Sequence, residues 1–494
     1  MQPYKNSFRH VLKATSLFGG VQVFNILISI IRSKFIALFI GPTGMGIASL
    51  FNTTINVVDA VTNLGLNRSA VKDISYAKEN YEASKVARTV HVLKRLVWFT
   101  AVIGAVLMMA TSPWLSEIAF ESKEYTVSFI WLAIALLFKQ FTHSNLAILQ
   151  GLQKLGNLAK ANLVGNSVGL LITVPLYYFF RIDAIVPAII IASLISFAIT
   201  IYYTNKTEVE KVKLTNKEAF SEGKEMINLG VTLSVSSVIT LIAAYIIQIY
   251  ISNEGGVDAV GYYNAGMVIL NTYVGLVFNA MSTDYFPRLS AVSNTIEKIK
   301  NVVFEQAYVA VLLIVPIVVI FIAFAPFFIT LLYSEAFTPT VAFVSWGILG
   351  MLFKAVSFSL GYIIIAKGDS RVFIKTAIGF NTALVVMNII GYTYWGLQGL
   401  GVSYFIYFII HLIVVWLITY YRYKFTFKKE FYYIFIVSTI LCFSSFLLSE
   451  IEDTVVKYVS LSIMIVISSI FSIYYIDKKI GIRDVIQNFF RRKK

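Results

Sequence analysis

The sequence predicts an all-α polytopic membrane protein with about 14 transmembrane helices, arranged as two pseudo-symmetric six-helix lobes plus two extra C-terminal helices. Three observations lead to this fold class: an apolar composition, many long apolar segments and an internal repeat. Of the 494 residues, 58% are hydrophobic and 14% are charged, whereas a typical soluble chain carries about 25% charged residues. The mean hydropathy is +0.76. The composition therefore indicates a chain that lies mostly within a bilayer.

Fourteen apolar segments are about 20 residues long, enough to cross the hydrocarbon core. They are 15–40, 44–66, 91–112, 126–148, 159–180, 184–204, 227–251, 259–283, 303–325, 338–366, 373–394, 399–421, 432–449 and 456–476. The first is too long for a signal peptide and lacks a cleavage site, so we expect it to remain as a helix. The longest connections, 67–90 and 205–226, are polar, and neither is long enough for a soluble domain.

The positions of Lys and Arg predict the orientation, because cytoplasmic loops of membrane proteins carry an excess of these residues. If the N-terminus is cytoplasmic, 32 of the 41 Lys and Arg residues fall on the cytoplasmic side. The other side holds only Lys123, Arg181 and Lys457. We therefore expect an even number of spans with both termini in the cytoplasm. The net charge of +15 is explained by this bias, and we do not expect a nucleic-acid partner.

An internal repeat relates positions 215 residues apart without a gap. The matched pairs with distinctive side chains are Asn56 and Asn271, Trp131 and Trp346, Lys139 and Lys354, Lys160 and Lys375, and Asn166 and Asn381. The first six predicted helices thus correspond to the next six. An even number of helices in each half predicts the same topology for both, with substrate bound between the halves near the bilayer midplane.

The repeat also predicts the domain organisation. Residues 1–204 form an N-terminal lobe of helices 1–6, and residues 205–226 form a cytoplasmic linker. Residues 227–421 form a C-terminal lobe of helices 7–12, and residues 422–494 hold helices 13 and 14 and a basic cytoplasmic tail.

Nine cations fall inside the predicted spans, and five of them lie close enough to a helix end to reach the interface. The other four lie deeper: Arg32, Lys34, Lys139 and Lys354. A charge near mid-membrane costs about 2.5–3.5 kcal/mol on insertion scales, so it needs a counter-ion or a watery cavity. Arg32 and Lys34 are two residues apart and point in different directions, so we expect at least one to face the cavity.

Asp59 is the one acid deep in the first half, and Asp284 lies at the end of a span in the second half. The surplus of buried positive charge favours an anionic substrate such as a phosphate or diphosphate. The alternative is that each cation only pairs with an acid or a helix-end carbonyl for assembly. His143, one turn from Lys139, either widens the polar patch and responds to pH or forms an interhelical hydrogen bond.

Enzyme chemistry finds little support in the sequence. No Walker loop, nucleophile elbow, zinc-protease motif or paired carboxylates in an outer loop are present. One cysteine and four scattered histidines exclude a disulfide within the chain and predict no metal site or other cofactor. We therefore expect a protein that is not an enzyme.

Four segments resemble those of Wzx-type flippases for O-antigen and enterobacterial common antigen. They are Lys34–Gly46, Leu149–Lys154, Val260–Ala265 and Phe286–Ser290, and their order and spacing cover essentially the whole chain. The resemblance implies a member of the multidrug/oligosaccharidyl-lipid/polysaccharide exporter superfamily, with two six-helix lobes around a central cavity. It implies movement of undecaprenyl-diphosphate-linked oligosaccharides from the cytoplasmic to the periplasmic leaflet of the bacterial inner membrane, in polysaccharide (lipopolysaccharide) biosynthesis. Lys34 lies where the resemblance places a cationic cavity residue.

The sequence thus predicts a flippase working by alternating access, with Arg32, Lys34, Lys139, His143 and Lys354 as substrate-binding residues. Asp59 is a candidate for coupling to a proton or sodium ion. Expected partners are the lipid-linked glycan, membrane lipids and other polysaccharide-assembly membrane proteins. One rival is a drug/cation antiporter of the same superfamily, which needs acids in its cavity. A second rival is a membrane-embedded polysaccharide polymerase or glycosyltransferase, which needs a sizeable outer loop or a carboxylate site.

Overall fold

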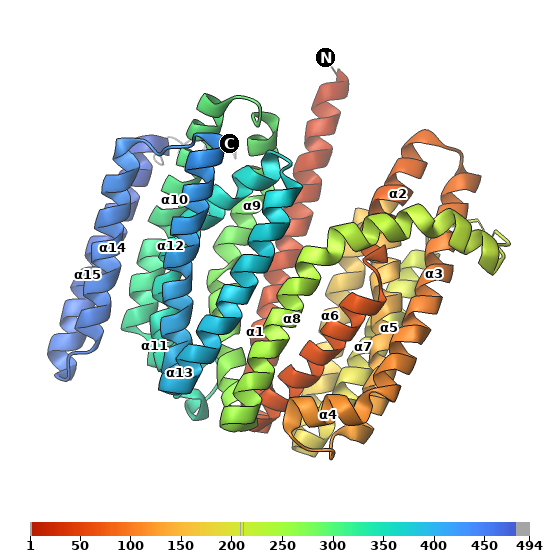
Figure 1. The fold of residues 1–494 in the computed structure, drawn as a ribbon, viewed down its shortest axis with the longest axis horizontal. Coiled ribbons are helices and arrows are strands. Elements are labelled where there is room, and N and C mark those ends of the chain that lie inside the picture. Colours follow the sequence, from red (N-terminus) through yellow and green to blue (C-terminus); the bar gives the residue numbers. More distant parts are fainter. Residues whose placement is uncertain (1, 208, 211, 481–494) are drawn as a thin grey trace, which may run out of the picture. The chain divides into compact units, whose positions relative to one another are not determined.

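The computed structural model describes the backbone of residues 2–207, 209–210 and 212–480, with side chains from residue 23 onward except at 279–280, 283–284 and 480. Every regular element in these ranges is a helix (Figure 1). The chain divides into two compact units. One holds residues 1–264 and 332–334, and the other holds 265–331 and 335–494. The lobe boundaries that the repeat predicts stay a prediction.

The first unit is built from long apolar helices and one amphipathic helix. Its elements are α1 (Gln2–Thr62), α2 (Leu66–Asn80), α3 (Ala83–Ala110), α4 (Ser112–Phe120), α5 (Thr126–Gly151), α6 (Leu155–Phe180), the 3₁₀ turn η1 (Arg181–Ala184), α7 (Ile185–Asn205) and most of α8 (Asn216–Val268). Helix α5 packs against α3, α7 and α2, and α6 packs against α7 and α1. Helix α5 therefore lies at the centre of its neighbours, where its polar residues meet other helices rather than lipid.

The second unit continues from the end of α8. Its elements are the π-helix η2 (Ile269–Val274), α9 (Leu276–Ala291), α10 (Ile296–Ala323), α11 (Ala325–Leu332), the 3₁₀ turn η3 (Glu335–Phe337), α12 (Thr340–Ala366), α13 (Ser370–Tyr423), α14 (Lys429–Ser449) and α15 (Thr454–Ile480). Helix α12 packs against α13 and α10, and α10 also contacts α14 and α15. Helices α14 and α15, which have no counterpart in the repeat, thus pack on the outside of α10.

In the described part of the chain, 10 helices are long and apolar enough to cross a membrane. Four of these are 40 to 63 residues long, far more than one crossing needs. Each of the four is interrupted: at Gly41, at η1, at Gly256 and at Trp395–Gly396. Dividing them at these breaks accounts for the fourteen predicted spans. The all-α, multi-pass architecture predicted from the sequence is confirmed.

The breaks recur with the spacing of the sequence repeat. Gly41 (φ 63) corresponds to Gly256 (φ 77), Gln153 (φ 53) to Gly368 (φ 68), and Arg181 (φ 51) to Gly396 (φ 54). Left-handed backbone is uncommon in residues other than glycine, so three matched occurrences indicate that the two halves share a backbone path. Gly41 is a one-residue kink between two predicted spans, because Pro42 is suited to the first position of the next helix.

Two kinked segments of the first unit approach each other at paired glycines. A Cβ atom at Gly46 would overlap the carbonyl oxygen of Val257, and one at Gly261 would overlap that of Pro42. Gly261 and Val257 lie 215 residues beyond Gly46 and Pro42, so this contact is reciprocal. Only glycine permits such a close approach of backbones.

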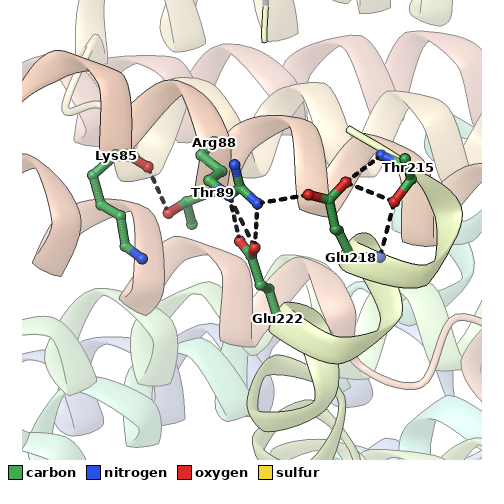
Figure 2. A network of polar contacts seen from close by, with 6 residues as sticks. All are labelled: Lys85, Arg88, Thr89, Thr215, Glu218 and Glu222. Carbon is green, nitrogen blue, oxygen red and sulfur yellow. Dashed lines mark hydrogen bonds and ion pairs between the residues drawn. The ribbon is translucent and has the colours of Figure 1, made fainter. Parts of the chain in front are cut away.

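The N-terminus of α8 is capped and tied to α3 by a charged network (Figure 2). Thr215 and Glu218 form a reciprocal capping box, in which Glu218 accepts from the Thr215 backbone and Thr215 Oγ1 accepts from the Glu218 backbone. Arg88 on α3 donates to both oxygens of Glu222 at 2.9 and 2.8 Å. The second half of the segment 205–226, expected to be a linker, is therefore helical and packed on the first unit.

Replacing Gly46 or Gly261 with Ala should lower the melting temperature of the purified protein. The added methyl group must push two backbones apart, and overpacking of this kind costs roughly 1–3 kcal/mol. Gly379 on α13, where a Cβ meets open space, provides the matched control: Gly379→Ala should leave the melting temperature unchanged or raise it. Equal melting temperatures for all three variants would contradict the close contact.

Asp369 makes stability depend on pH in the second unit. The hydrogen bond from Arg422 Nε, at 2.6 Å, holds the pKa of Asp369 below its usual range, with help from the backbone of Val372 and the hydroxyl of Tyr423. A carboxyl whose pKa is lowered by folding stabilises the fold above its unfolded pKa of ~3.9, and this is lost as the pH falls through the folded value. Asp369→Asn should therefore melt below wild type near neutral pH, and the gap should narrow as the pH falls below the unfolded pKa of ~3.9. A gap that is constant with pH would exclude the charged contact.

Candidate functional site

The first lysine site lies in the first unit and joins α5 to α1. Lys139 Nζ donates to Asn56 Oδ1 and lies 3.5 Å from Asp59 Oδ2. The side chain of Asp59 is 8% exposed and that of Lys139 is 23% exposed. Asp59 therefore supplies the counter-ion that a lysine at this depth requires. Lys139 thus has the acid partner that the pairing alternative expects, and both that alternative and the substrate-binding role stay predictions.

His143 lies one turn further along α5 and also faces Asp59. Its Nδ1 atom lies 3.6 Å from Asp59 Oδ2, and it is a buried nitrogen without a hydrogen-bond partner among the described residues. The expected interhelical hydrogen bond is thus not formed by Nδ1. Asp59 instead lies between two basic groups, and one carboxylate cannot fully neutralise both when His143 is protonated.

A cavity of about 300 Å³ lies beside this site within the first unit. Its wall includes three predicted site residues, Arg32 from α1 and Lys139 and His143 from α5. Arg32 Nη2 donates to the Asn166 carbonyl at 3.5 Å, while Arg32 Nε is buried and has no described partner. The remaining wall is made of small and polar residues of α6 and α7 together with parts of α1 and α5. The cavity thus combines cations with unused hydrogen-bond donors, which suits an anion.

Arg32 and Lys34 occupy different surroundings. Arg32 lines the cavity and Lys34 is not part of its wall, as the angular separation of these two residues on a helix requires. Asn166, which also lines the cavity, donates from Nδ2 to Asn25 Oδ1 at 3.0 Å. The roles of Arg32, Lys34, Lys139, His143 and Lys354 in substrate binding stay predictions.

The second lysine site, in the second unit, repeats the first with one change. Lys354 Nζ on α12 donates to Asn271 Oδ1 at 2.9 Å, and the hydroxyl of Tyr404 donates to the same oxygen at 3.0 Å. Both lysine–asparagine pairs are 83 residues apart in the chain. The repeat thus preserves an interhelical contact, as expected for polar residues in membrane helices.

The second lysine site differs from the first in having no carboxylate at the position that corresponds to Asp59. The positions that correspond to Asp59 and His143 are Val274 and Phe358. Instead of an acid, Lys354 Nζ has the rings of Phe408 and Phe278 at 5.2 and 5.7 Å from their centroids, and among the described residues it forms no ion pair. Aromatic faces attract a cation but do not cancel its charge.

Asn271 lies in the π-helix η2. Single-turn π-helices are rare and often occur at functional sites. In the part of the chain that the structure describes, no group of three or more His, Cys, Asp or Glu residues could hold a metal ion.

Sequence reasoning missed several of these partners. It singled out Asn56 and Asn271 as a matched pair but did not connect them to the lysines, although their equal spacing was a usable signal. No feature of the sequence marked Tyr404 and the two phenylalanines as neighbours of Lys354, because aromatic residues are frequent throughout the chain. Arg32 and Lys139 were predicted separately, and their shared cavity depends on packing.

The family is decided by a match of residues 35–342, more than half of the chain, to the model of the family described as polysaccharide biosynthesis protein. The chain belongs to this family. It is 25% identical over 407 residues to a Shigella flexneri protein named as an O-antigen transporter, covering 80% of this chain and 94% of the relative. It is 22% identical over 364 residues to the lipid III flippase of Escherichia coli K12, covering 72% and 84% of the two chains.

Solved structures show the same fold. The lipid II flippase MurJ in an inward closed conformation matches with a TM-score of 0.73 at 15% identity, covering 95% of this chain and 99% of that one. A multidrug resistance MATE family transporter in an inward-facing conformation matches with a TM-score of 0.67 at 14% identity, covering 82% and 96%. The polysaccharide biosynthesis protein described here is thus a multi-pass membrane protein with a fold found in transporters.

The two lysine sites should respond differently to loss of the lysine. Lys139→Met leaves the buried Asp59 without its nearest cation, and breaking such a pair costs about 3–5 kcal/mol. Lys354→Met removes a hydrogen bond and leaves no carboxylate behind, so it should cost about 0.5–1.5 kcal/mol. Denaturant unfolding in detergent would measure both.

The double variant Asp59→Asn/Lys139→Met serves as the control for the first site. It should recover most of the stability that Lys139→Met loses, because no buried charge is left. Equal losses at Lys139 and Lys354, with no recovery in the double variant, would show that Asp59 does not stabilise the site through its charge.

Proposed function

We propose that this protein is a flippase that moves an undecaprenyl-diphosphate-linked oligosaccharide from the cytoplasmic to the periplasmic leaflet of the bacterial inner membrane. The observation that carries the proposal is the incomplete neutralisation of the buried cations. Arg32 and Lys139 line one cavity with a single nearby carboxylate, Asp59, and Lys354 has no carboxylate among its described neighbours. A diphosphate supplies the missing negative charge. The names of the relatives in Shigella and Escherichia coli support the same substrate class.

Asp59 explains how such a substrate could be bound without being trapped. Lys139 has Asp59 as an internal partner, so a diphosphate must compete with this carboxylate. Transport requires binding that is favourable enough for entry and weak enough for release. In the proposed cycle, the diphosphate draws Lys139 away from Asp59, and the return of Lys139 to Asp59 assists release.

The rest of the proposed mechanism follows the two-lobed repeat. In the proposed cycle the protein works by alternating access, so that its substrate-binding residues are exposed first to the cytoplasm and then to the periplasm. The polar head crosses through the cavity while the polyprenyl tail stays in lipid. We propose no cofactor. Asp59 is the proposed residue for coupling to a proton or sodium ion, because it is a buried carboxylate shared by two basic groups.

The proposal includes the setting of the protein. Both termini are cytoplasmic, as the distribution of Lys and Arg predicts. Membrane lipids and other polysaccharide-assembly membrane proteins are the proposed partners. The chain acts as a transporter and not as an enzyme.

A drug/cation antiporter is the second candidate, favoured by the structural likeness to a multidrug transporter. Such a protein needs a carboxylate that is available to an organic cation. Asp59 already has Lys139 as a partner at 3.5 Å, so an organic cation that approached it would be repelled by this ammonium group. The charge arrangement therefore favours an anionic substrate over a cationic one.

Transport in proteoliposomes tests the proposal. The purified protein is reconstituted with a fluorescent undecaprenyl-diphosphate-linked oligosaccharide, and its movement between leaflets is followed. Lys354→Ala should slow transport about tenfold or more, because a hydrogen bond to a charged group is worth about 1.5–3 kcal/mol. Lys354→Arg should keep more of the rate, since it keeps the charge.

Lys298→Ala is the matched control, because Lys298 is exposed near the start of α10 and its loss is the same change in charge. Lys139→Ala should slow transport less than Lys354→Ala, because Asp59 already weakens the electrostatic attraction between Lys139 and the substrate. Unchanged transport by folded Lys139→Ala, Lys354→Ala and double variants would exclude the cationic site. Transport of organic cations instead would favour the antiporter.

A further inference from the structure

A second basic pocket lies in the second unit, away from the Lys354 site. It has a volume of about 530 Å³ and is formed by α9, α10, α15 and the residue before α14. Its wall is Met281, Arg288, Phe304, Glu305, Gln306, Tyr308, Val309, Lys428 and Lys479. None of these residues takes part in the proposed transport site. Of its three cations, Arg288 lies 3.6 Å from Glu305 and Lys479 lies 2.9 Å from Glu430, and Lys428 is the one without an ion pair among the described residues.

Two lysines of the pocket are held over the same ring. Lys428 Nζ lies 5.0 Å and Lys479 Nζ 5.6 Å from the centroid of Phe304. Lys479 has a carboxylate partner, Glu430, at 2.9 Å, and Lys428 forms no ion pair among the described residues. The ring face attracts each ammonium group but does not cancel its charge, so Lys428 keeps a positive charge that an anion can neutralise.

Gln306 provides independent evidence for a ligand. Its side chain is buried, with the residue 4% exposed, and it lines the pocket. Its Nε2 atom has no hydrogen-bond acceptor among the described residues. A buried amide donor without an acceptor costs about 1–3 kcal/mol, so such groups usually have a partner. The partner that fits this donor and the neighbouring Lys428 is an anionic oxygen.

The position of the pocket indicates a lipid. Lys428 directly precedes α14 and Lys479 is in the last turn of α15, so the pocket lies at the ends of membrane-spanning helices. Exposed tyrosines border these ends, Tyr433 at 55% and Tyr474 at 59%, as in the aromatic belts of membrane interfaces. Further along α15, Ile470 and Ile473 are 63% and 61% exposed and offer an apolar surface to acyl chains.

We propose that this pocket binds the phosphate group of an anionic phospholipid. Gln306 donates to a phosphate oxygen, Lys428 and Lys479 supply the charge, and the acyl chains lie along the apolar face of α15. Basic pockets between transmembrane helices bind lipid head groups in this way. The site ties helices α14 and α15, which the repeat does not include, to α10 through a lipid.

Native mass spectrometry of the full-length protein in detergent tests the proposal. Wild-type protein is titrated with dioleoyl-phosphatidylglycerol, and the fraction that retains the lipid is measured. Lys428→Ala and Gln306→Leu should each bind about fivefold more weakly, the change expected for loss of one cation or donor near the membrane surface. Lys428→Arg should bind like wild type, and its melting temperature checks the fold.

Three comparisons decide the outcome. Lys298→Ala, the same change in charge on an exposed part of α10, should retain phosphatidylglycerol like wild type. Dioleoyl-phosphatidylcholine, which has the phosphate without net charge, should bind less tightly. Inorganic phosphate alone should not displace the lipid at equal concentration. Equal retention by wild type, Lys428→Ala and Gln306→Leu would overturn the site, and displacement by inorganic phosphate would overturn its assignment to a lipid.

Discussion

A lysine ammonium group inside a transmembrane helix is the constraint on which this structure depends. Lipid offers it no partner, so the side chain must meet polar groups of another helix or water. Both halves meet this need in the same way, with an asparagine that accepts a hydrogen bond from the lysine. The packing of α1 against α5, and of η2 against α12, therefore has to bring an asparagine next to each buried lysine.

The two halves then differ in how they treat the charge. The first half adds a carboxylate, Asp59, and a histidine. The second half replaces them with Val274 and Phe358 and surrounds Lys354 with a tyrosine hydroxyl and two rings. A duplicated framework thus carries two chemically distinct sites. The proposed function rests on this asymmetry, because only the first lysine has an internal carboxylate with which a substrate would compete.

The sequence predicted the fold well because its strongest signals are local or repeated. Apolar segments of about 20 residues report directly on membrane spans, and the 215-residue register predicted equivalent residues in both halves. It did not predict the amphipathic helix α2 or the helical start of α8 within 205–226, because short polar helices depend on capping and docking, here by Thr215 and Arg88. It also did not predict that Gly41, Gln153 and Arg181 would share left-handed backbone with their repeats.

The sequence by itself determined the class of protein, the repeat and which charged residues lie within membrane-spanning segments. Composition and spacing are sufficient for this, because burial of charge in lipid is costly wherever it occurs. The tertiary structure decided which charges are compensated. It joined Lys139 to Asp59, left Lys354 with neutral partners, brought Arg32 to the same cavity as Lys139, and brought Lys428 to Gln306 in a separate pocket. These distinctions depend on distances of a few ångströms between helices far apart in the chain, and no sequence pattern encodes such distances directly.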